Sequence, residues 1–123
     1  MKRSNKKPTG ARYKTMSKKT RYQRGRDAVP ATIGPTKIKK KRARGDSQKL
    51  IVYRTDVINV ISEGKAQKAK ILNVIENPAD PHFVRRNVMT KGAIVETDVG
   101  KVRITSRPGQ HGVINGVLVE GKK

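Results

Sequence analysis

Large apolar side chains are concentrated in the second part of the chain. Residues 1–45 contain five of them (Met1, Met16, Val29, Ile33 and Ile38), whereas residues 46–123 contain 25. Of those 25 residues, 20 are Val or Ile, whose branched side chains suit pleated strands. Only residues 46–123 therefore carry enough apolar surface to fold around a core of their own.

Turn signals divide residues 46–123 into runs of strand length. The run 102–107 alternates, with Val102 and Ile104 on one face and Arg103 and Arg107 on the other. Many short strands separated by Gly- and Pro-containing turns are typical of a small barrel. The predicted fold is mainly β: an antiparallel β-barrel of about six strands with a long basic, largely irregular N-terminal arm. The sequence predicts strands over 50–61 (two strands or one bent strand), 68–76, 88–90, 93–98, 102–107 and 113–120.

The arm is predicted to span residues 1–45 and the barrel domain residues 46–123. Ordering a backbone costs roughly 1–2 kcal/mol per residue, and residues 1–45 have too little apolar surface to offset that cost alone. Glycines and prolines exclude one long helix from the arm. Residues 14–24 are its only helix candidate, and that helix would need a partner.

Charge separates the same two parts. The chain of 123 residues has a formal net charge of +21, of which +16 falls in residues 1–45 and +5 in residues 46–123. Such an excess indicates a polyanionic partner. We expect a soluble intracellular protein, because there is no cysteine for a disulfide framework, no secretory signal and no apolar run of membrane-spanning length.

Cations of the arm are the main candidates for phosphate contacts, and nucleic acid is favoured over a membrane surface because apolar anchors on one helical face are missing. The spacing of glycines among them suits an irregular folded RNA. A nuclear address in residues 37–44 stays open. The candidate cations of the arm are Lys6, Lys7, Arg12, Lys14, Lys18, Lys19, Arg21, Arg24, Arg26, Lys37, Lys39, Lys40, Lys41, Arg42 and Arg44.

Two further groups are candidates for RNA contact. Tyr13 and Tyr22 lie among the cations of the arm, where their rings would either stack on unpaired bases or pack on backbone. On the barrel, a second phosphate contact or an ordinary solvated face is expected at Arg85, Arg86, Lys101, Arg103 and Arg107.

Residues for catalysis or cofactor binding are lacking. His82 and His111 are the only histidines, and both are interpreted as loop residues without metal-ligand spacing. The glycines at 112 and 116 are not followed by the Lys-Ser/Thr of a phosphate-binding loop. Glu96 and Asp98 are more typical of surface salt bridging than of acid–base chemistry. We therefore expect that the protein is not an enzyme and that it binds no cofactor, metal or small-molecule substrate.

Six short strings, in order and across nearly the whole chain, resemble the S-eight-e family of small-subunit ribosomal proteins in its compact archaeal form. Any one of these strings is weak evidence for the family, but six strings in the family's order form a specific match. One departure is Asp46-Ser47, which follows Arg44-Gly45 where the family usually has Gly-Asn. The strings are Lys7-Pro8-Thr9-Gly10, Arg24-Gly25-Arg26, Thr32-Ile33-Gly34, Phe83-Val84-Arg85-Arg86, Thr90-Lys91-Gly92-Ala93-Ile94-Val95-Glu96-Thr97 and Thr105-Ser106-Arg107-Pro108-Gly109-Gln110.

The resemblance implies a structural protein of the small ribosomal subunit, cytoplasmic and in the ribosome, without enzymatic activity. Its partners would be ribosomal RNA and neighbouring small-subunit proteins rather than a second copy of itself. Two alternatives stay open: a general nucleic-acid-compacting or RNA-chaperone protein, and an RNA-modifying enzyme or its accessory subunit. Asp46 argues against a direct phosphate contact at that junction and is expected instead to shape a turn or to pair with a neighbouring cation.

Overall fold

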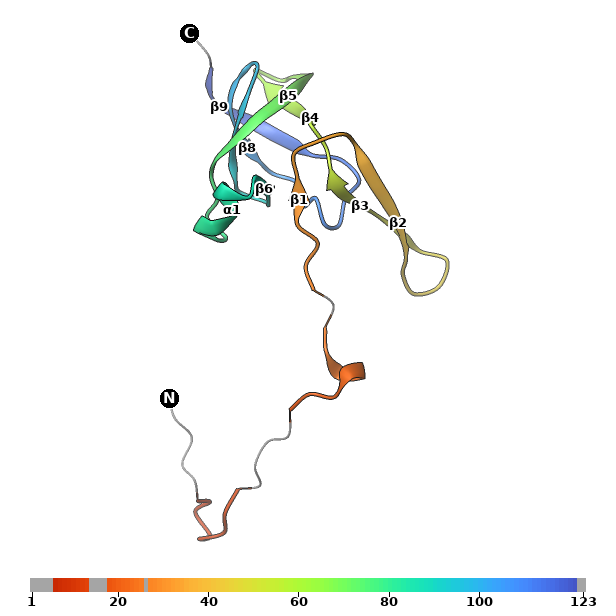
Figure 1. Ribbon diagram of the computed structural model, residues 1–123, viewed down its shortest axis with the longest axis vertical. Coiled ribbons are helices and arrows are strands. Elements are labelled where there is room, and N and C mark those ends of the chain that lie inside the picture. The colour runs from red at the N-terminus through yellow and green to blue at the C-terminus, as the bar shows by residue number, and fades with distance from the viewer. Residues whose placement is uncertain (1–5, 14–17, 26, 122–123) are drawn as a thin grey trace.

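The computed structural model describes residues 6–13, 18–25 and 27–121, and its regular elements are almost all strands (Figure 1). No helix in these residues is long and apolar enough to cross a membrane. In chain order the elements are η1 (Arg21–Gln23), β1 (Ala31–Thr32), β2 (Lys37–Arg42), β3 (Gln48–Arg54), β4 (Val57–Ser62), β5 (Lys65–Glu76), α1 (Pro81–Arg85), β6 (Val88–Met89), β7 (Ile94–Thr97), β8 (Gly100–Ile104) and β9 (Asn115–Gly121).

Strands β4, β5, β7, β8 and β9 form a closed barrel in that spatial order (Figure 1). Each strand pairs antiparallel with the next, and β9 closes the barrel by pairing parallel with β4. The closing register places Asn59 opposite Asn115 and Val60 opposite Gly116. Closure leaves the barrel without an unpaired edge strand.

Side chains alternate along the barrel strands, and those that face inward fill the interior of the barrel. In β8, for example, Lys101 and Arg103 are exposed whereas Val102 and Ile104 are buried. Irregular register in β5 and β8 allows the strands to bend around this small core. The core consists of Ile58, Val60, Ala69, Ile71, Val74, Met89, Ala93, Val95, Val102, Ile104 and Ile114.

A second sheet, with strand order β2-β3-β1-β6, lies beside the barrel. Strand β1 runs parallel to β3 and antiparallel to β6, and its Ala31 is buried. Strand β2 forms an antiparallel hairpin with β3, whose Val52 is 1% exposed. At the hairpin turn Gly45 adopts a φ of 64°, a left-handed conformation that glycine tolerates best.

The predicted barrel is confirmed, with five strands instead of about six. The run 50–61 is two strands, and they belong to different sheets: β3 to the four-stranded sheet and β4 to the barrel. Strand β6, within the predicted run 88–90, also joins the four-stranded sheet. The pairings β4–β9 and β1–β3 are parallel, which a purely antiparallel barrel would not contain.

Part of the predicted arm is regular. Residues 37–42 form β2 because β3 supplies an antiparallel partner, with Ile38 opposite Val52 and a register shift between Lys37 and Ile38. Tertiary pairing here outweighs the weak strand propensity of lysine. Of the helix candidate 14–24, residues 14–17 lie outside the described residues, and only Arg21–Gln23 form a single 3₁₀ turn. Residues 6–13 and 18–25 lie away from the barrel, beyond β1 (Figure 1).

Candidate nucleic-acid interface

The β2–β3 hairpin presents the basic run on a paired strand. Five of the six residues of β2 are Lys or Arg, and its pairing with β3 places Lys39 opposite Ile51 and Lys40 opposite Leu50. Because strand side chains alternate, these cations lie on both faces of the hairpin. All are exposed except Lys41, which is half-buried.

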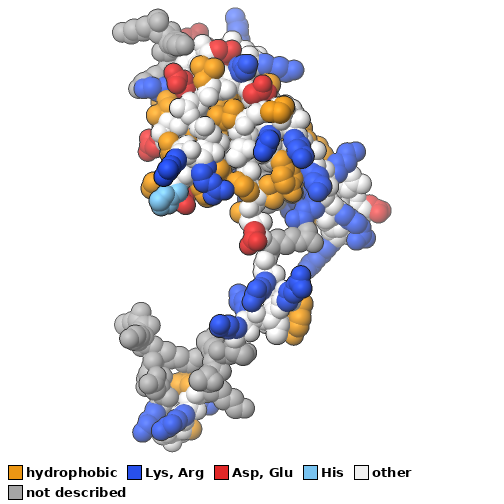
Figure 2. Space-filling model, in the orientation of Figure 1, with side chains coloured by type: hydrophobic (Ala, Val, Ile, Leu, Met, Phe, Trp, Pro, Cys, Tyr) orange, Lys and Arg blue, Asp and Glu red, His pale blue; other side chains and the backbone are white. Residues whose placement is uncertain are grey.

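Positive charge gathers around this hairpin. On the face in Figure 2, Lys and Arg side chains crowd over the hairpin and along residues 18–25, whereas Asp and Glu are scattered over the barrel. Asp46 lies exposed in the hairpin turn, beside Gly45. The turn is closed by the Ala43 N–H, which donates to the Ser47 carbonyl at 2.9 Å. A single acid therefore sits at the tip of an otherwise cationic hairpin.

One face of the hairpin forms a cleft with the segment that precedes β1. We call it the basic cleft. The Lys39 ammonium lies 6.0 Å from the centroid of the Tyr53 ring, within the range of a cation–π contact. The cleft thus combines an aromatic ring, aliphatic walls and several cations. Its lining residues are Asp27, Val29, Lys39, Lys40, Lys41, Ile51 and Tyr53.

The sequence-based site included the three lysines of this cleft but missed Tyr53. A signal was available: Ile51 and Tyr53 are two residues apart in a predicted strand, so they share a face. What the sequence does not reveal is which strand lies beside them. The prediction of stacking rings considered only Tyr13 and Tyr22, which lie among the cations in sequence.

Residues 6–13 form a tight turn. The Lys7 N–H donates to the Ala11 carbonyl at 2.8 Å, and the Gly10 N–H donates to the Lys7 carbonyl at 2.9 Å. Lys6 and Arg12 pair as an isolated bridge. The Lys7 ammonium lies 5.6 Å from the Tyr13 ring centroid. The predicted candidates of this segment are thus brought together around one turn.

Residues 18–25 present their candidates to solvent. Lys18, Lys19, Arg21 and Arg24 are exposed, and Tyr22 is 85% exposed. An aromatic side chain so fully exposed has no packing role within the described part of the protein. The candidates at positions 14 and 26 lie outside the described residues.

The barrel cations are dispersed. Arg85 and Arg86 are exposed at the end of α1, and Arg103 is exposed on β8 beside Lys101. The prediction that Arg107 shares that strand face is wrong, because β8 ends at Ile104. Arg107 instead lies in a turn whose backbone hydrogen bonds run from the amides of residues 110 and 111 to its carbonyl, both at 2.9 Å.

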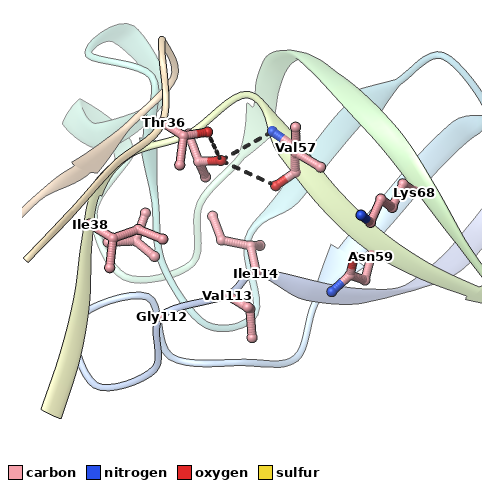
Figure 3. A pocket seen from close by; sticks show the side chains of 10 residues that line it. Thr36, Ile38, Val57, Asn59, Lys68, Gly112, Val113 and Ile114 are labelled. Carbon is pink, nitrogen blue, oxygen red and sulfur yellow. Dashed lines mark hydrogen bonds between the residues drawn. The ribbon is translucent and has the colours of Figure 1, made fainter. Parts of the chain in front are cut away.

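A second cleft has a different character (Figure 3). We call it the aliphatic cleft; it lies between the hairpin, β4 and the segment 112–114. At one end the Thr55 hydroxyl is 3.3 Å from that of Thr36 and accepts the Val57 N–H at 3.2 Å. Lys68 is its single cation. Its remaining lining residues are Ile38, Val52, Asn59, Gly112, Val113 and Ile114.

Structural hydrogen bonds involve both histidines and Asp98. His82 lies in α1, not in the predicted loop, and its N–H is capped by Asp80 Oδ1 at 2.9 Å. His111 Nδ1 accepts a long hydrogen bond from the Arg107 N–H at 3.4 Å. Asp98 Oδ1 accepts the Lys70 N–H at 3.1 Å. In the part of the chain that the structure describes, no group of three or more His, Asp or Glu could hold a metal ion.

Comparison with known proteins agrees with the sequence resemblance. The family described as Ribosomal protein S8e matches residues 1–119. The small ribosomal subunit protein eS8 of Haloarcula marismortui is 45% identical over 118 residues, which cover 96% of each chain. The protein of the same name from Methanocorpusculum labreanum is 48% identical over 120 residues, again covering 96% of each chain.

A third relative extends this comparison. The small ribosomal subunit protein eS8 of Nanoarchaeum equitans is 46% identical over 120 residues, covering 96% of this chain and 94% of its own. These relatives are archaeal, so the resemblance to the compact archaeal form is confirmed. A match over nearly the full length, at this identity, establishes common ancestry: the chain belongs to the ribosomal protein S8e family.

Proposed function

We propose that the protein is a structural constituent of the small ribosomal subunit that binds and stabilises folded ribosomal RNA through its cationic residues. The observation that carries this proposal is β2, an exposed strand in which five of six residues are Lys or Arg. Relatives covering nearly the whole chain are named as small ribosomal subunit proteins. The ribosomal protein S8e family is structural, so the chain is not an enzyme.

The mechanism is charge neutralisation. Phosphates of neighbouring RNA helices repel one another, and Lys or Arg side chains placed between them release condensed counterions and reduce that repulsion. We assign this role to the cations of residues 1–45, which carry +16 of the net +21. The barrel fixes the point at which this segment enters the RNA.

Pairing of β2 with β3 makes part of the cationic surface rigid. The hairpin backbone is ordered before RNA arrives, so its lysines lose less conformational freedom on binding than they would in an irregular chain. Two kinds of contact follow. The hairpin supplies fixed cations close to the barrel, and residues 6–13 and 18–25 supply cations that reach further into the RNA.

Location and partners follow from the same proposal. The protein works in the cytoplasm within the ribosome, beside other small-subunit proteins, and as a single copy. Exposed large apolar side chains on the barrel, among them Val117 at 44% and Val119 at 54%, are available for such neighbours. The cations outside the hairpin and arm (Arg85, Arg86, Lys101, Arg103 and Arg107) are proposed as secondary phosphate contacts.

The test uses full-length variants, of which the first two remove the same number of charges at different places. One replaces Lys39, Lys40 and Lys41 by Gln; a matched control replaces Lys65, Lys68 and Lys70 of β5, three exposed lysines on the barrel. A third variant replaces the nine cations between positions 6 and 26. Affinity for small-subunit RNA is measured between about 50 and 200 mM salt, a range across which phosphate contacts make affinity fall steeply.

We expect the slope of log affinity against log salt to flatten by about 0.7–0.9 for each phosphate contact removed. For the hairpin variant, which lacks three lysines, the slope should flatten by about two to three in total. It should flatten more for the arm variant and change little for the β5 control. Equal slopes for the hairpin and β5 variants would show that total charge, and not this surface, determines binding. Equal affinity for duplex DNA, without cosedimentation with small subunits, would favour a general nucleic-acid-compacting protein.

A further inference from the structure

We propose that the basic cleft binds a single unpaired RNA nucleotide, with its base stacked on the Tyr53 ring and its phosphate held by the adjacent lysines. This inference rests on the proposed function, because it takes RNA as the ligand. It adds a specific site to a binding mode that otherwise depends only on charge.

Tyr53 supplies the stacking surface. The ring is half-buried in β3, at the register shift between the pairs Val52–Ile38 and Arg54–Lys37, and residues on both sides of it are paired. A ring held in this way loses little freedom when a base stacks on it. Every base has a π-face, so stacking on a tyrosine is favourable whatever the sequence. Val29 and Ile51 extend the apolar surface beside the ring.

Two lysines supply the phosphate contact. Lys39, Lys40 and Lys41 all line the cleft, but side chains alternate along β2, so only Lys39 and Lys41 share the face of Ile51. The Lys39 ammonium now lies 6.0 Å from the Tyr53 ring centroid. Its long, flexible stem lets the ammonium leave the ring for a phosphate when a base takes its place.

Asp27 orients the ligand. It is the one acid among the residues lining the basic cleft, so a phosphate is repelled from it and directed toward the lysines. A carboxylate accepts hydrogen bonds, and the exocyclic amino group of cytosine is a donor of the kind that Asp recognises. The base edge therefore belongs at Asp27, which favours cytosine over uracil.

The aliphatic cleft does not offer this combination (Figure 3). Lys68 and Asn59 contribute nitrogen atoms to one side of it, but the walls are formed by aliphatic side chains such as Ile38 and Val113. No aromatic ring lines it. Of the two clefts, only the basic cleft combines a ring for stacking with clustered cations.

The experiment compares two RNAs with the full-length protein: a blunt duplex, and the same duplex with one bulged cytidine. Tyr53→Ile removes the ring but keeps a residue that suits a strand. We expect it to weaken binding of the bulged RNA by about 5- to 150-fold, the range measured for loss of base–aromatic stacking, and to weaken binding of the blunt duplex much less. Tyr53→Phe should retain binding of both RNAs, because stacking requires the ring and not the hydroxyl.

Ultraviolet cross-linking of the unsubstituted protein to the bulged RNA gives a readout that does not depend on a variant folding. Mass spectrometry should identify the peptide containing Tyr53, and replacing the bulged cytidine by uridine should reduce affinity unless Asp27→Asn is also present. Equal weakening of both RNAs by Tyr53→Ile, or a cross-link confined to other segments, would overturn the nucleotide site. Salt-dependent binding of both RNAs would still leave the proposed function standing, whereas binding of neither would overturn both.

Discussion

Gly116 is a buried residue of β9 where the barrel leaves no room for a side chain. It pairs with Val60 of β4 and with Ile104 of β8, so backbone lies on both sides of it. A Cβ at this position would overlap Val102 Cγ1 and would lie 2.9 Å from the Arg103 carbonyl oxygen. The absence of a side chain at Gly116 is thus a requirement of packing.

Replacing Gly116 by Ala should therefore destabilise the barrel. Overpacking of a closed core costs about 1–3 kcal/mol, because the surrounding side chains must leave their preferred positions. Urea denaturation of Gly116→Ala against the unsubstituted protein measures this cost. Gly109→Ala is the matched control, since a Cβ at Gly109 meets nothing within 4 Å and its φ is not positive. Equal midpoints for the two variants would contradict the packing argument.

Asn77 is a buried polar residue whose side chain joins three backbone or side-chain groups. Its Nδ2 donates to the Val88 carbonyl at 3.0 Å. Its Oδ1 accepts from the Ala79 N–H at 3.0 Å and from the Thr90 hydroxyl at 2.7 Å. Asn77 is 4% exposed, so none of these partners can readily exchange it for water. The side chain secures the segment between β5 and β6.

Asn77→Ala should cost about 1–3 kcal/mol, because it leaves buried hydrogen-bonding groups without a partner. Chemical denaturation measures the loss, and hydrogen exchange should show faster exchange at Ala79. Asn73→Ala serves as the control: Asn73 is exposed and its side chain accepts from the adjacent Val74 N–H. A loss at Asn77 no larger than that at Asn73 would mean that the network does not stabilise the fold.

Among the elements, β1 contains only two residues but has an interior position in the four-stranded sheet. It lies between β3 and β6 in the four-stranded sheet and buries Ala31 at 1% exposure. Strand β2 covers the other edge of β3. Both strands precede Gly45, where composition placed the boundary of the folded domain. The stable unit suggested by these pairings begins before β1.

Two truncated chains test this boundary. Residues 27–123 keep the whole four-stranded sheet, whereas residues 46–123 lose β1 and β2 and leave β3 unpaired on both edges. We expect the longer chain to unfold at nearly the same urea concentration as the full protein. The shorter chain should lose on the order of 3–6 kcal/mol, because Ile51 and Val52 become exposed. Equal stability of the two would support a domain boundary at Gly45.

Across the whole molecule, the barrel strands were predictable because their signals are local. Alternation in residues 102–104 and turns such as that at Gly64 specify where strands begin and end. Their grouping was not predictable, because nothing local states that β3 leaves the barrel or that β9 runs parallel to β4. Those choices depend on contacts between residues far apart in the chain.

The candidate site likewise has a part that was predictable from local sequence and a part that was not. Lysines 39–41 were identified from charge alone, since clustered cations need no partner to be recognised. Their strand conformation was not foreseen, because cations at successive positions carry no alternation of polar and apolar residues. Tyr53 was missed for a related reason: its role depends on a neighbouring strand and on Asp27, 26 positions earlier in the sequence.

Barrel closure between β4 and β9 sets an order of events during synthesis. Asn59 and Asn115, whose side chains meet at 3.0 Å across this closure, are 56 positions apart. A pairing of such high contact order forms late, since a long loop must first be closed. A nascent chain that has not yet produced β9 presents β4 and β8 as open edges, prone to pairing with other chains. The interval between making β4 and making β9 is thus the period in which this protein is most vulnerable to aggregation.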